Sequence, residues 1–575
     1  MAKHILVTGE VHGVGFRPFV YGLATRLDLH GWICNTPGGV EIYVEGCPSG
    51  VESFLEKIIT EKPSQVRIDS LEIRSEESRL KYKTFDILPS LGPDDLQLPI
   101  KADLAICPDC ERELFDPRDR RYLYPFISCT HCGPRYSIIQ GVPYDRSDTT
   151  MAEFGLCDDC SAEYTDPLDR RFHAHSTACS DCGPFVALRE IHSQWPNASL
   201  KISSIECRTS AILKARRLLR EGYILGIKGL GGFQLACDAS NSLTVEDLRD
   251  RKGRIDKPFA LMASDLEVIR SICSLSREEE ELLTSHEKPI VLLEKKFHKG
   301  QEFSVSRWVA PNIDTLGVML PYTPLHHLLL NQTDLLLATE PAPRLLVMTS
   351  GSLANEPIAT QDEDALLRLS PLADAFILHN REIHLRSDDS IVRVDPGMVG
   401  RNDHHSQSSP AVYLRRSRGY APYAVRLACE VKPTLAVGSE FKNAFCLARD
   451  RQAFLSPFIG SMENVQTYES FEQSVGHLSN AFNVRPEIVA HDLNPDYFST
   501  QYVRRSTFTA RRVAVQHQHA HIASCMADHN LDDRRLIGLC FDGTGYGTDG
   551  AFWGGEVLLA SYSSFERFAH LEYLP

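Results

Sequence analysis

Two features that the sequence lacks exclude whole classes of protein. Its apolar runs are much shorter than the roughly 20 residues that span a bilayer. The first residues, MAKHILVTGEVHG, contain neither a basic region nor an apolar stretch ahead of a cleavage site. Basic residues are also outnumbered, 61 against 76 acidic, so the net charge of −15 disfavours nucleic acid as the main partner. We therefore expect a cytoplasmic protein that binds neither membrane nor nucleic acid.

Cysteine, by contrast, is plentiful, with 17 residues in a chain of 575. Eight of them form four C-x-x-C pairs. In a chain without a secretory leader, this pattern indicates metal binding rather than a disulfide framework. The length predicts three to five domains, because single cores rarely grow past about 250–300 residues.

The cysteine pairs belong to an internal repeat in a region that we place at residues 105–190. ICPDCERELFDPRDRRYLYPFISCTHCGP returns as LCDDCSAEYTDPLDRRFHAHSTACSDCGP after an offset of 50 residues. Two C-x-x-C turns supply the four ligands of one tetrahedral zinc ion, and a filled four-thiolate site is structural. We predict two such sites, with the ligands Cys107, Cys110, Cys129 and Cys132 and the ligands Cys157, Cys160, Cys179 and Cys182.

The alternative for these pairs is thioredoxin-like redox chemistry, which the repeat disfavours. Three histidines near them, His131, His173 and His175, are surplus to two complete sets of four cysteines. We expect these histidines to lie at the surface or at a contact between domains.

Residues 1–91 have the pattern of a small α+β domain. Strand-like and helical segments follow one another as βαββαβ, the order of a ferredoxin-like fold, with the first helix predicted over 18–30. The glycine-rich loop from Thr8 to Arg17 opens this helix. Its backbone N–H groups and its arginine suit a phosphoryl group, although a plain tight turn would have a similar sequence.

This loop, together with Gly31-Trp-Ile-Cys-Asn35, resembles the signature pair of acylphosphatases. The resemblance implies that Arg17 binds the phosphate and that Asn35 orients the attacking water. His12 stands where acylphosphatases usually have glutamine.

Residues 200–400 alternate helical and strand-like segments and predict a larger α/β domain. Lys228-Gly-Leu-Gly-Gly-Phe233 is followed by five basic residues within positions 249–257. Such a cationic strip in an acidic protein suits the phosphates of a nucleotide, whereas the alternative is a solvated helix face.

These segments, with Met348-Thr-Ser-Gly351, resemble the YrdC-type domain of carbamoyl-adenylate and threonylcarbamoyl-adenylate synthases. The resemblance implies that ATP is used with magnesium as a substrate. It also implies a set of residues for the phosphates and the carboxylate being activated: Lys228, Lys252, Arg254, Lys257, Thr349 and Ser350. Ser352 stands where the family commonly has asparagine.

In residues 410–575, His517 and His521 are one helical turn apart and can share a metal, although histidines on a hydrated helix look the same. With Phe541-Asp-Gly-Thr-Gly-Tyr-Gly547, they resemble the metal- and nucleotide-binding domain of threonylcarbamoyl transferases, in the actin-like ATPase superfamily. The resemblance implies Asp542 as a further ligand and iron or zinc as the metal. The domain lacks a second lobe, so we expect it to be partial and truncated at its C-terminal end.

The four domains occur in an order that resembles the HypF family, the carbamoyltransferases of NiFe-hydrogenase maturation. The resemblance implies three steps: cleavage of carbamoyl phosphate, activation of carbamate by ATP as carbamoyl-adenylate, and transfer to the C-terminal cysteine of a partner, HypE. Because the last domain is predicted to be partial, we expect cleavage and adenylation but poor transfer.

Two alternatives remain open at this point. A threonylcarbamoyl-adenylate enzyme of tRNA modification would share the last two domains, but the acylphosphatase-like segment and the negative charge disfavour it. A zinc-based interaction protein with inactive catalytic domains would keep the cysteine repeat alone.

Overall fold

The computed structural model describes residues 1–36, 39–63, 66–76, 82–88, 100–141, 145–191, 202–296, 305–353, 356–395, 411–507 and 509–573. Residues 90–99, whose Pro, Gly and Asp content predicts a linker, and the polar residues 402–409 lie outside these ranges. Among the described residues, no helix combines the length and the apolar character needed to cross a membrane.

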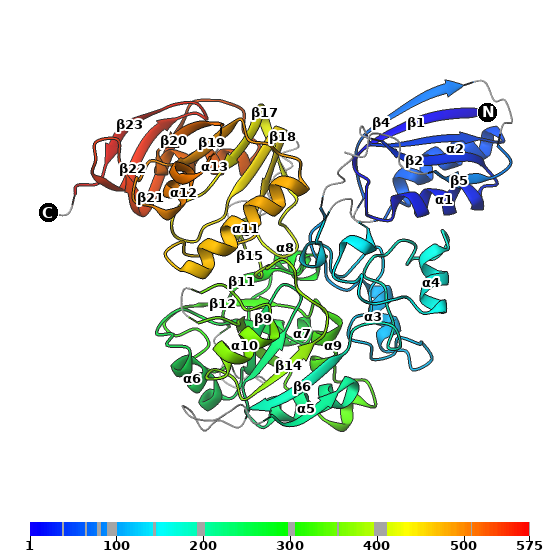
Figure 1. Ribbon diagram of the computed structural model, residues 1–575, viewed down its shortest axis with the longest axis horizontal. Coiled ribbons are helices and arrows are strands. Elements are labelled where there is room, and N and C mark those ends of the chain that lie inside the picture. The colour runs from blue at the N-terminus through cyan, green and yellow to red at the C-terminus, as the bar shows by residue number, and fades with distance from the viewer. Residues whose placement is uncertain are drawn as a thin grey trace.

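The first domain is a five-stranded sheet in the order β4-β1-β3-β2-β5, covered by two helices (Figure 1). Its elements are β1 (Ala2–Glu10), α1 (Phe16–Arg26), β2 (His30–Thr36), β3 (Gly39–Glu45), α2 (Pro48–Thr60), β4 (Arg67–Glu76) and β5 (Phe85–Ile87). The predicted ferredoxin-like order is confirmed. Helix α1 ends four residues earlier than predicted, because the chain turns at Asp28, whose φ is +52°.

The cysteine-rich region contains little regular structure and lies between the first sheet and the next domain (Figure 1). Its elements are α3 (Pro108–Leu114), η1 (Tyr136–Ile138), η2 (Arg146–Asp148) and α4 (Asp158–Thr165). Each helix begins directly after the first cysteine of a repeat, with Cys107 and Cys157 at the N-cap positions. The repeat in sequence is therefore a repeat in structure.

The third domain is built on one mixed sheet of 11 strands, in the order β16-β15-β11-β12-β10-β13-β9-β8-β14-β6-β7. Its strands are β6 (Val186–Ile191), β7 (Ile202–Cys207), β8 (Leu225–Lys228), β9 (Phe233–Asp238), β10 (Ala260–Ala263), β11 (Ile290–Glu294), β12 (Thr315–Met319), β13 (Leu345–Ser350), β14 (Ala375–His379), β15 (Ile391–Val394) and β16 (Ala411–Arg415). Its helices are α5 (Arg208–Arg220), α6 (Ser242–Arg251), α7 (Leu266–Ile272), α8 (Arg277–Thr284), α9 (Pro324–Leu330), η3 (Leu337–Thr339) and α10 (Asp362–Leu369). Strands β6 and β16 lie outside the range expected for this domain, so the sheet extends beyond it on both sides.

The last domain has a four-stranded sheet, β18-β17-β19-β20, and a three-stranded sheet, β21-β22-β23. Its elements are β17 (Ala424–Ala436), β18 (Cys446–Leu455), α11 (Val465–Ala481), β19 (Ile488–Asp492), α12 (Phe498–Arg505), β20 (Arg511–Val515), α13 (His517–Asp528), β21 (Leu536–Tyr546), β22 (Phe552–Ala560) and β23 (Phe565–His570). Helix α13 contacts both sheets. It therefore places the histidines of its first turn at the junction between them.

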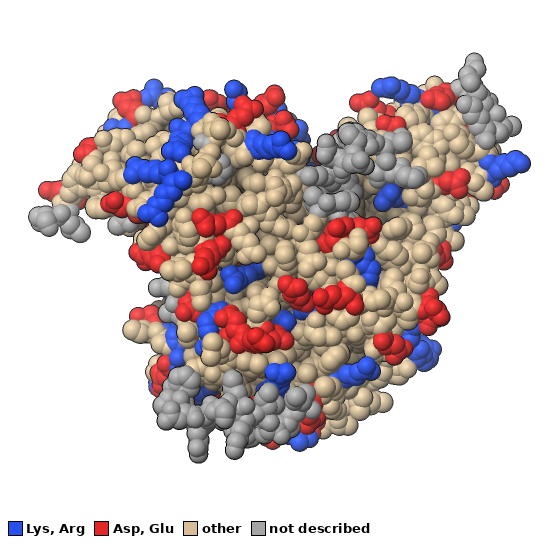
Figure 2. All heavy atoms as spheres, in the orientation of Figure 1, with Lys and Arg blue, Asp and Glu red and all other residues tan. Residues whose placement is uncertain are grey.

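The surface agrees with the acidic composition. Figure 2 shows basic and acidic side chains interspersed over most of the described part of the face in view, while several basic side chains lie next to one another over the last domain.

Candidate functional sites

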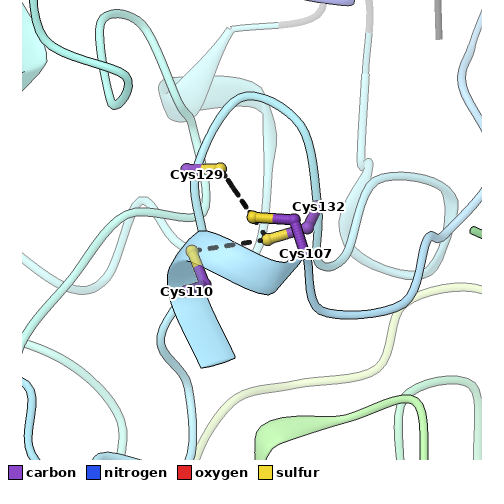
Figure 3. A group of neighbouring side chains, drawn as sticks. All are labelled: Cys107, Cys110, Cys129 and Cys132. Atoms are coloured by element: carbon purple, nitrogen blue, oxygen red, sulfur yellow. Dashed lines mark hydrogen bonds between the residues drawn. The ribbon is translucent and has the colours of Figure 1, made fainter. Parts of the chain in front are cut away.

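The first zinc unit brings its four cysteines to one point. The sulfur atoms of Cys107, Cys110, Cys129 and Cys132 point toward one another, and Cys110 comes from α3 (Figure 3). Neighbouring sulfurs are 3.6 to 3.8 Å apart. A tetrahedral zinc ion with bonds of about 2.3 Å would hold its sulfurs at about this separation, whereas a disulfide would need about 2.05 Å. The residues fit a zinc ion.

The second unit, Cys157, Cys160, Cys179 and Cys182, repeats this geometry. Its neighbouring sulfurs are also 3.6 to 3.8 Å apart. Two complete sets of four thiolates leave no open position for a substrate, so both units are structural. The two units differ in exposure, because the first is fully buried while Cys157 and Cys182 of the second are partly exposed.

The Arg17 loop joins β1 to α1 and is built around left-handed glycines. Gly13 and Gly15 have φ values of +64° and +74°, and Gly15 is the N-cap of α1. Burial lowers the pKa of the Arg17 guanidinium, which nonetheless stays charged. Asn35 on β2 is 1% exposed, and its Oδ1 accepts no hydrogen bond from any described residue. A buried amide oxygen without a donor suits a bound water or substrate hydroxyl.

His12 occupies the loop without supplying charge. Its Nε2 lies 3.0 Å from the Gly39 carbonyl oxygen. Burial lowers the pKa of His12 to about 4, so the imidazole is neutral at pH 7. Histidine at this position, where acylphosphatases usually have glutamine, therefore adds no positive charge beside Arg17.

The cavity at the Arg17 loop has a second wall, which the cysteine-rich region provides. This space of about 270 Å³ is lined by Arg17 on one side and by Arg135, His173 and His175 on the other. The loop also approaches this region closely, because a Cβ atom at Gly15 would lie 2.7 Å from Nε2 of His131. The three surplus histidines are therefore residues of a contact between domains, as expected.

The third domain has a pocket that is lined by most of the residues predicted to bind ATP, and we call it the nucleotide-like pocket. A cavity of about 230 Å³ is lined by Arg254, Lys257, Thr349 and Ser350. Arg254 donates from Nη1 to Oγ1 of Thr349 at 2.8 Å, which links the basic segment to β13. Burial, together with Arg249 and Arg415, lowers the pKa of Arg254 to about 10.

Lys252 lies in an adjoining cavity of about 550 Å³ that also reaches the last domain. Its ammonium donates to the carbonyl oxygens of Ser350 and Ser352, at 2.6 and 2.8 Å. Burial, and then the charges of Arg254 and Lys257, lowers the pKa of Lys252 to about 7. Positive charge is therefore crowded here, a condition that a polyphosphate would relieve.

The basic strip is not a solvated helix face. Arg249 is buried and donates to backbone carbonyls, including that of Trp308. Arg251 pairs with Asp247 and Asp374 at the end of α6. Two of the five basic residues are thus structural, and the other three face the two cavities.

Lys228 lies apart from the other predicted residues. The Lys228-Gly-Leu-Gly-Gly-Phe233 segment is the hairpin between β8 and β9, and Lys228 faces a small cavity next to the first zinc unit. Its ammonium pairs with Asp362 at 2.6 Å and donates to the carbonyl oxygen of His379. Arg381 lines the same cavity, and burial lowers its pKa to about 10.

Several residues that the sequence analysis did not single out also line the nucleotide-like pocket. They are Gln234, Tyr322, Asp388, Asp389 and Arg415. Arg418 holds Asp389 with a 2.8 Å ion pair. The adjacent carboxylates of Arg386-Ser-Asp-Asp-Ser390 are the one local sequence signal for these residues. The pocket itself is not predictable from this segment, because strands far apart in sequence form it.

The third candidate site forms at the first turn of α13. Nε2 of His517 lies 3.1 Å from Nε2 of His521 and 3.0 Å from Oδ2 of Asp542 on β21. Two ring nitrogens and a carboxylate oxygen this close suit a shared cation. Oδ2 of Asp492 lies 2.7 Å from Nδ1 of His517, so it fixes this ring. The three predicted ligands are therefore brought together.

Comparisons with known proteins match every part of this architecture. The family models that match are Acylphosphatase over residues 3–87, the HypF finger over 106–139 and 156–188, and the Sua5/YciO/YrdC family, described as telomere recombination, over 217–401. The HypF Kae1-like domain follows over 430–528, and a carbamoyltransferase Kae1-like second subdomain over 538–575.

Relatives that match nearly the whole chain decide the family. The chain is 44% identical to carbamoyltransferase HypF2 of Cupriavidus necator over 99% of its own length and 69% of that protein. The chain belongs to the HypF carbamoyltransferase family. Carbamoyltransferase HypF of Synechocystis is 43% identical, again over 99% of this chain and 69% of that protein.

A solved structure supports the same assignment. The chain is similar to a full-length HypF in its phosphate- and nucleotide-bound form, with a TM-score of 0.85 and 43% identity over all of this chain and 70% of that one. The predicted fold class is confirmed, with an acylphosphatase domain, cysteine units, a YrdC-like domain and a Kae1-like domain. The interpretation as an enzyme, a carbamoyltransferase, is confirmed as well.

Proposed function

We propose that this HypF-family chain cleaves carbamoyl phosphate, activates the carbamate with ATP and passes the carbamoyl group to a thiolate. The acceptor is the C-terminal cysteine of HypE, and the product serves the cyano ligands of NiFe hydrogenase. The observation that carries this proposal is a series of cavities in the order of the three reactions, whose successive members share lining residues or are lined by residues adjacent in sequence.

The first step uses the Arg17 loop. The guanidinium and the loop N–H groups bind the phosphoryl oxygens, and Asn35 orients a water that cleaves the mixed anhydride. The products are carbamate and phosphate. A relative of known structure in this family was solved in a phosphate- and nucleotide-bound form, which supports two such ligands here.

The second step requires carbamate to reach the next site before it decomposes. Arg135 lines the Arg17 cavity, and the adjacent Pro134 lines the small cavity that contains Lys228 and Arg381. Tyr322 lines both that cavity and the nucleotide-like pocket. Buried cations along this line, which Asp103 balances in part, attract an anion such as carbamate.

The adenylation then follows at Arg254, Lys257 and Lys252. An oxygen of carbamate attacks the α-phosphorus of ATP, pyrophosphate leaves, and the basic side chains balance the charge of the phosphates. Magnesium comes with ATP. Because Lys252 carries a lowered pKa, binding of a polyphosphate raises that pKa and draws a proton onto the amine.

The last step takes place at the shared cavity between the third and last domains. Phe441, Lys442, Phe458 and Ser461 line it opposite Lys252. The acceptor thiolate attacks the carbamoyl carbon, and AMP leaves. His517, His521 and Asp542 would hold an iron or zinc ion, which would supply positive charge to the phosphate of the nucleotide. Asp492 holds His517 in the orientation that this requires.

A stepwise assay tests this proposal. Phosphate release from carbamoyl phosphate, ATP–pyrophosphate exchange and the mass of a peptide with the acceptor cysteine are followed with one preparation. We expect exchange that depends on carbamoyl phosphate and that Arg17→Ala abolishes. Exchange that requires threonine and bicarbonate would favour the tRNA-modification alternative. Zinc binding without phosphate release, unchanged by Arg17→Ala, would favour the interaction protein.

A further inference from the structure

The two zinc units exchange arginines. Each unit contains an Asp-Arg-Arg segment between its two cysteine pairs, namely Arg120–Arg121 in the first and Arg170–Arg171 in the second. The arginines of each pair contact the cysteine and glutamate of the other unit. The residues contacted stand at equivalent positions of the repeat.

From the second unit, Arg170 donates from Nη1 to Sγ of Cys110 at 2.9 Å and pairs with Glu113. Arg171 donates to the same carboxylate at 2.5 Å and, from Nε, to the Ser128 carbonyl oxygen at 3.2 Å. Arg171 is 4% exposed. The second unit thus supplies two guanidinium groups to a metal ligand and a nearby carboxylate of the first.

The first unit returns the equivalent contacts and adds one, from Arg121 to the cysteine sulfur. Arg120 and Arg121 donate to Sγ of Cys160 at 3.3 and 3.4 Å, and both pair with Glu163. Nε of Arg121 donates to the Ala178 carbonyl oxygen at 2.9 Å, and Arg121 is 1% exposed. Since Glu163 and Ala178 stand 50 positions after Glu113 and Ser128, the contact has the form of a two-fold dimer interface within one chain.

These contacts couple the two metal sites. Zinc in the first unit closes the loop between Cys110 and Cys129, and this loop carries Arg120 and Arg121. Zinc in the second unit closes the loop between Cys160 and Cys179, which carries the other two arginines. A site of four thiolates around Zn²⁺ has a net negative charge, which buried guanidinium groups stabilise.

We propose that the two zinc units bind zinc cooperatively, because zinc at each unit orders the arginines that donate hydrogen bonds to a cysteine thiolate of the other unit. The coupling is reciprocal, since the effect of the first metal on the second equals the effect of the second on the first. The fit of both cysteine sets to zinc is the premise, and no catalytic step enters the inference.

The direct test uses the whole protein at half loading. Metal-free protein is mixed with one zinc ion per protein molecule, which is enough for one of its two four-cysteine sites. Thiols that zinc does not protect are then alkylated in a short pulse and counted by intact mass. We expect molecules with both units protected or neither, each outnumbering those with one unit protected. A random distribution, with half of the molecules protected in one unit, would overturn the proposal.

A crossed variant assigns the effect to the arginines. Arg170→Gln lies in the second unit but should weaken zinc binding at the first, by roughly 10–100-fold in a chelator competition. The matched control is Arg118→Gln, an exposed arginine whose ion pair is with Asp116 of its own unit. Peptide mapping of the alkylated cysteines identifies which unit lost metal. Weakening confined to the second unit, or no weakening, would contradict the proposal.

A second variant guards against simple misfolding. Arg170→Lys keeps the charge but loses the planar fork, and should give an intermediate loss at the first unit. Circular dichroism at full zinc saturation should match the unaltered protein in both variants. If both variants fold when saturated and neither changes the affinity of the first unit, the proposal fails.

Discussion

The two zinc units have the same repeat and the same sulfur geometry, but they face different neighbours. The four cysteines of the first unit belong to the hydrophobic core that also contains α5 and β8 of the third domain. In the second unit, Cys157 and Cys182 are partly exposed, and the unit faces the Arg17 cavity. The first unit is thus part of the core of the YrdC-like domain, and the second is a wall of the Arg17 cavity.

One pair of equivalent positions shows how a repeat acquires two roles. Leu123 and His173 have the same left-handed backbone, with φ values of +54° and +51°. Leu123 is buried in the core, whereas His173 lines the cavity of Arg17. The repeat determines the backbone, and the side chain at this position fits each unit to its neighbour.

The largest expected difference concerns the cysteines themselves. Cys110→Ser should destabilise the protein by more than about 4 kcal/mol, because it removes a ligand inside a shared core. Cys160→Ser should cost roughly half as much, because the second unit is more open. Denaturant unfolding of the two variants under zinc saturation measures this difference. Equal losses would mean that the two units support the fold alike.

The next predicted difference is between two equivalent positions, one that affects stability and one that affects catalysis. Leu123→Ala should cost about 2–3 kcal/mol of stability, through the cavity it leaves, with little change in the KM for carbamoyl phosphate. His173→Ala should leave stability nearly unchanged but lower kcat/KM for phosphate release by roughly tenfold or more, since it widens the site around Arg17. Thermal unfolding and a phosphate-release assay on both variants make the comparison. A kinetic defect in Leu123→Ala alone would reverse the roles.

Zinc release should also distinguish the units. Local opening is easier where ligands are partly exposed, so a chelator should take zinc from the second unit first, and the first unit should follow closely because Arg170 and Arg171 are then no longer held in place. Timed alkylation followed by peptide mapping gives the two rates. A first unit that loses its zinc before the second, or that keeps its zinc long after the second is empty, would contradict this order.

The smallest effect is an acid sensitivity specific to the second unit. Burial lowers the pKa of His175 to about 4 in the folded chain, against about 6.5 when unfolded. Between these values the unfolded chain binds more protons, so this contribution to stability is lost as pH falls from 6.5 to 4. The equivalent position in the first unit is Pro125, which does not titrate.

His175→Gln is the variant that removes this contribution to stability. It should flatten the fall in unfolding midpoint between pH 6.5 and 4, relative to the unaltered protein. Identical pH profiles for the two proteins would show that His175 does not titrate against the fold.

Local patterns made much of this molecule predictable. The cysteine ligands lie in short turns whose spacing alone sets the geometry, and His517 and His521 share one helical turn. Other features depend on distant segments. The resemblance to YrdC-type domains places Lys228 and Lys252 in one ligand set, but the β8–β9 hairpin directs Lys228 to a cavity beside the first zinc unit. Asp388 and Arg415 meet the pocket only through β15 and β16.

In the proposed reaction sequence, carbamate passes inside the protein from the Arg17 cavity to the nucleotide-like pocket. The most direct measurement is the ratio of pyrophosphate to phosphate released from carbamoyl phosphate and ATP in the first turnover. We predict a ratio near one, which falls in Arg381→Gln while phosphate release continues, and which the exposed control Arg393→Gln leaves unchanged. A ratio in Arg381→Gln equal to that of the unaltered protein would contradict the account.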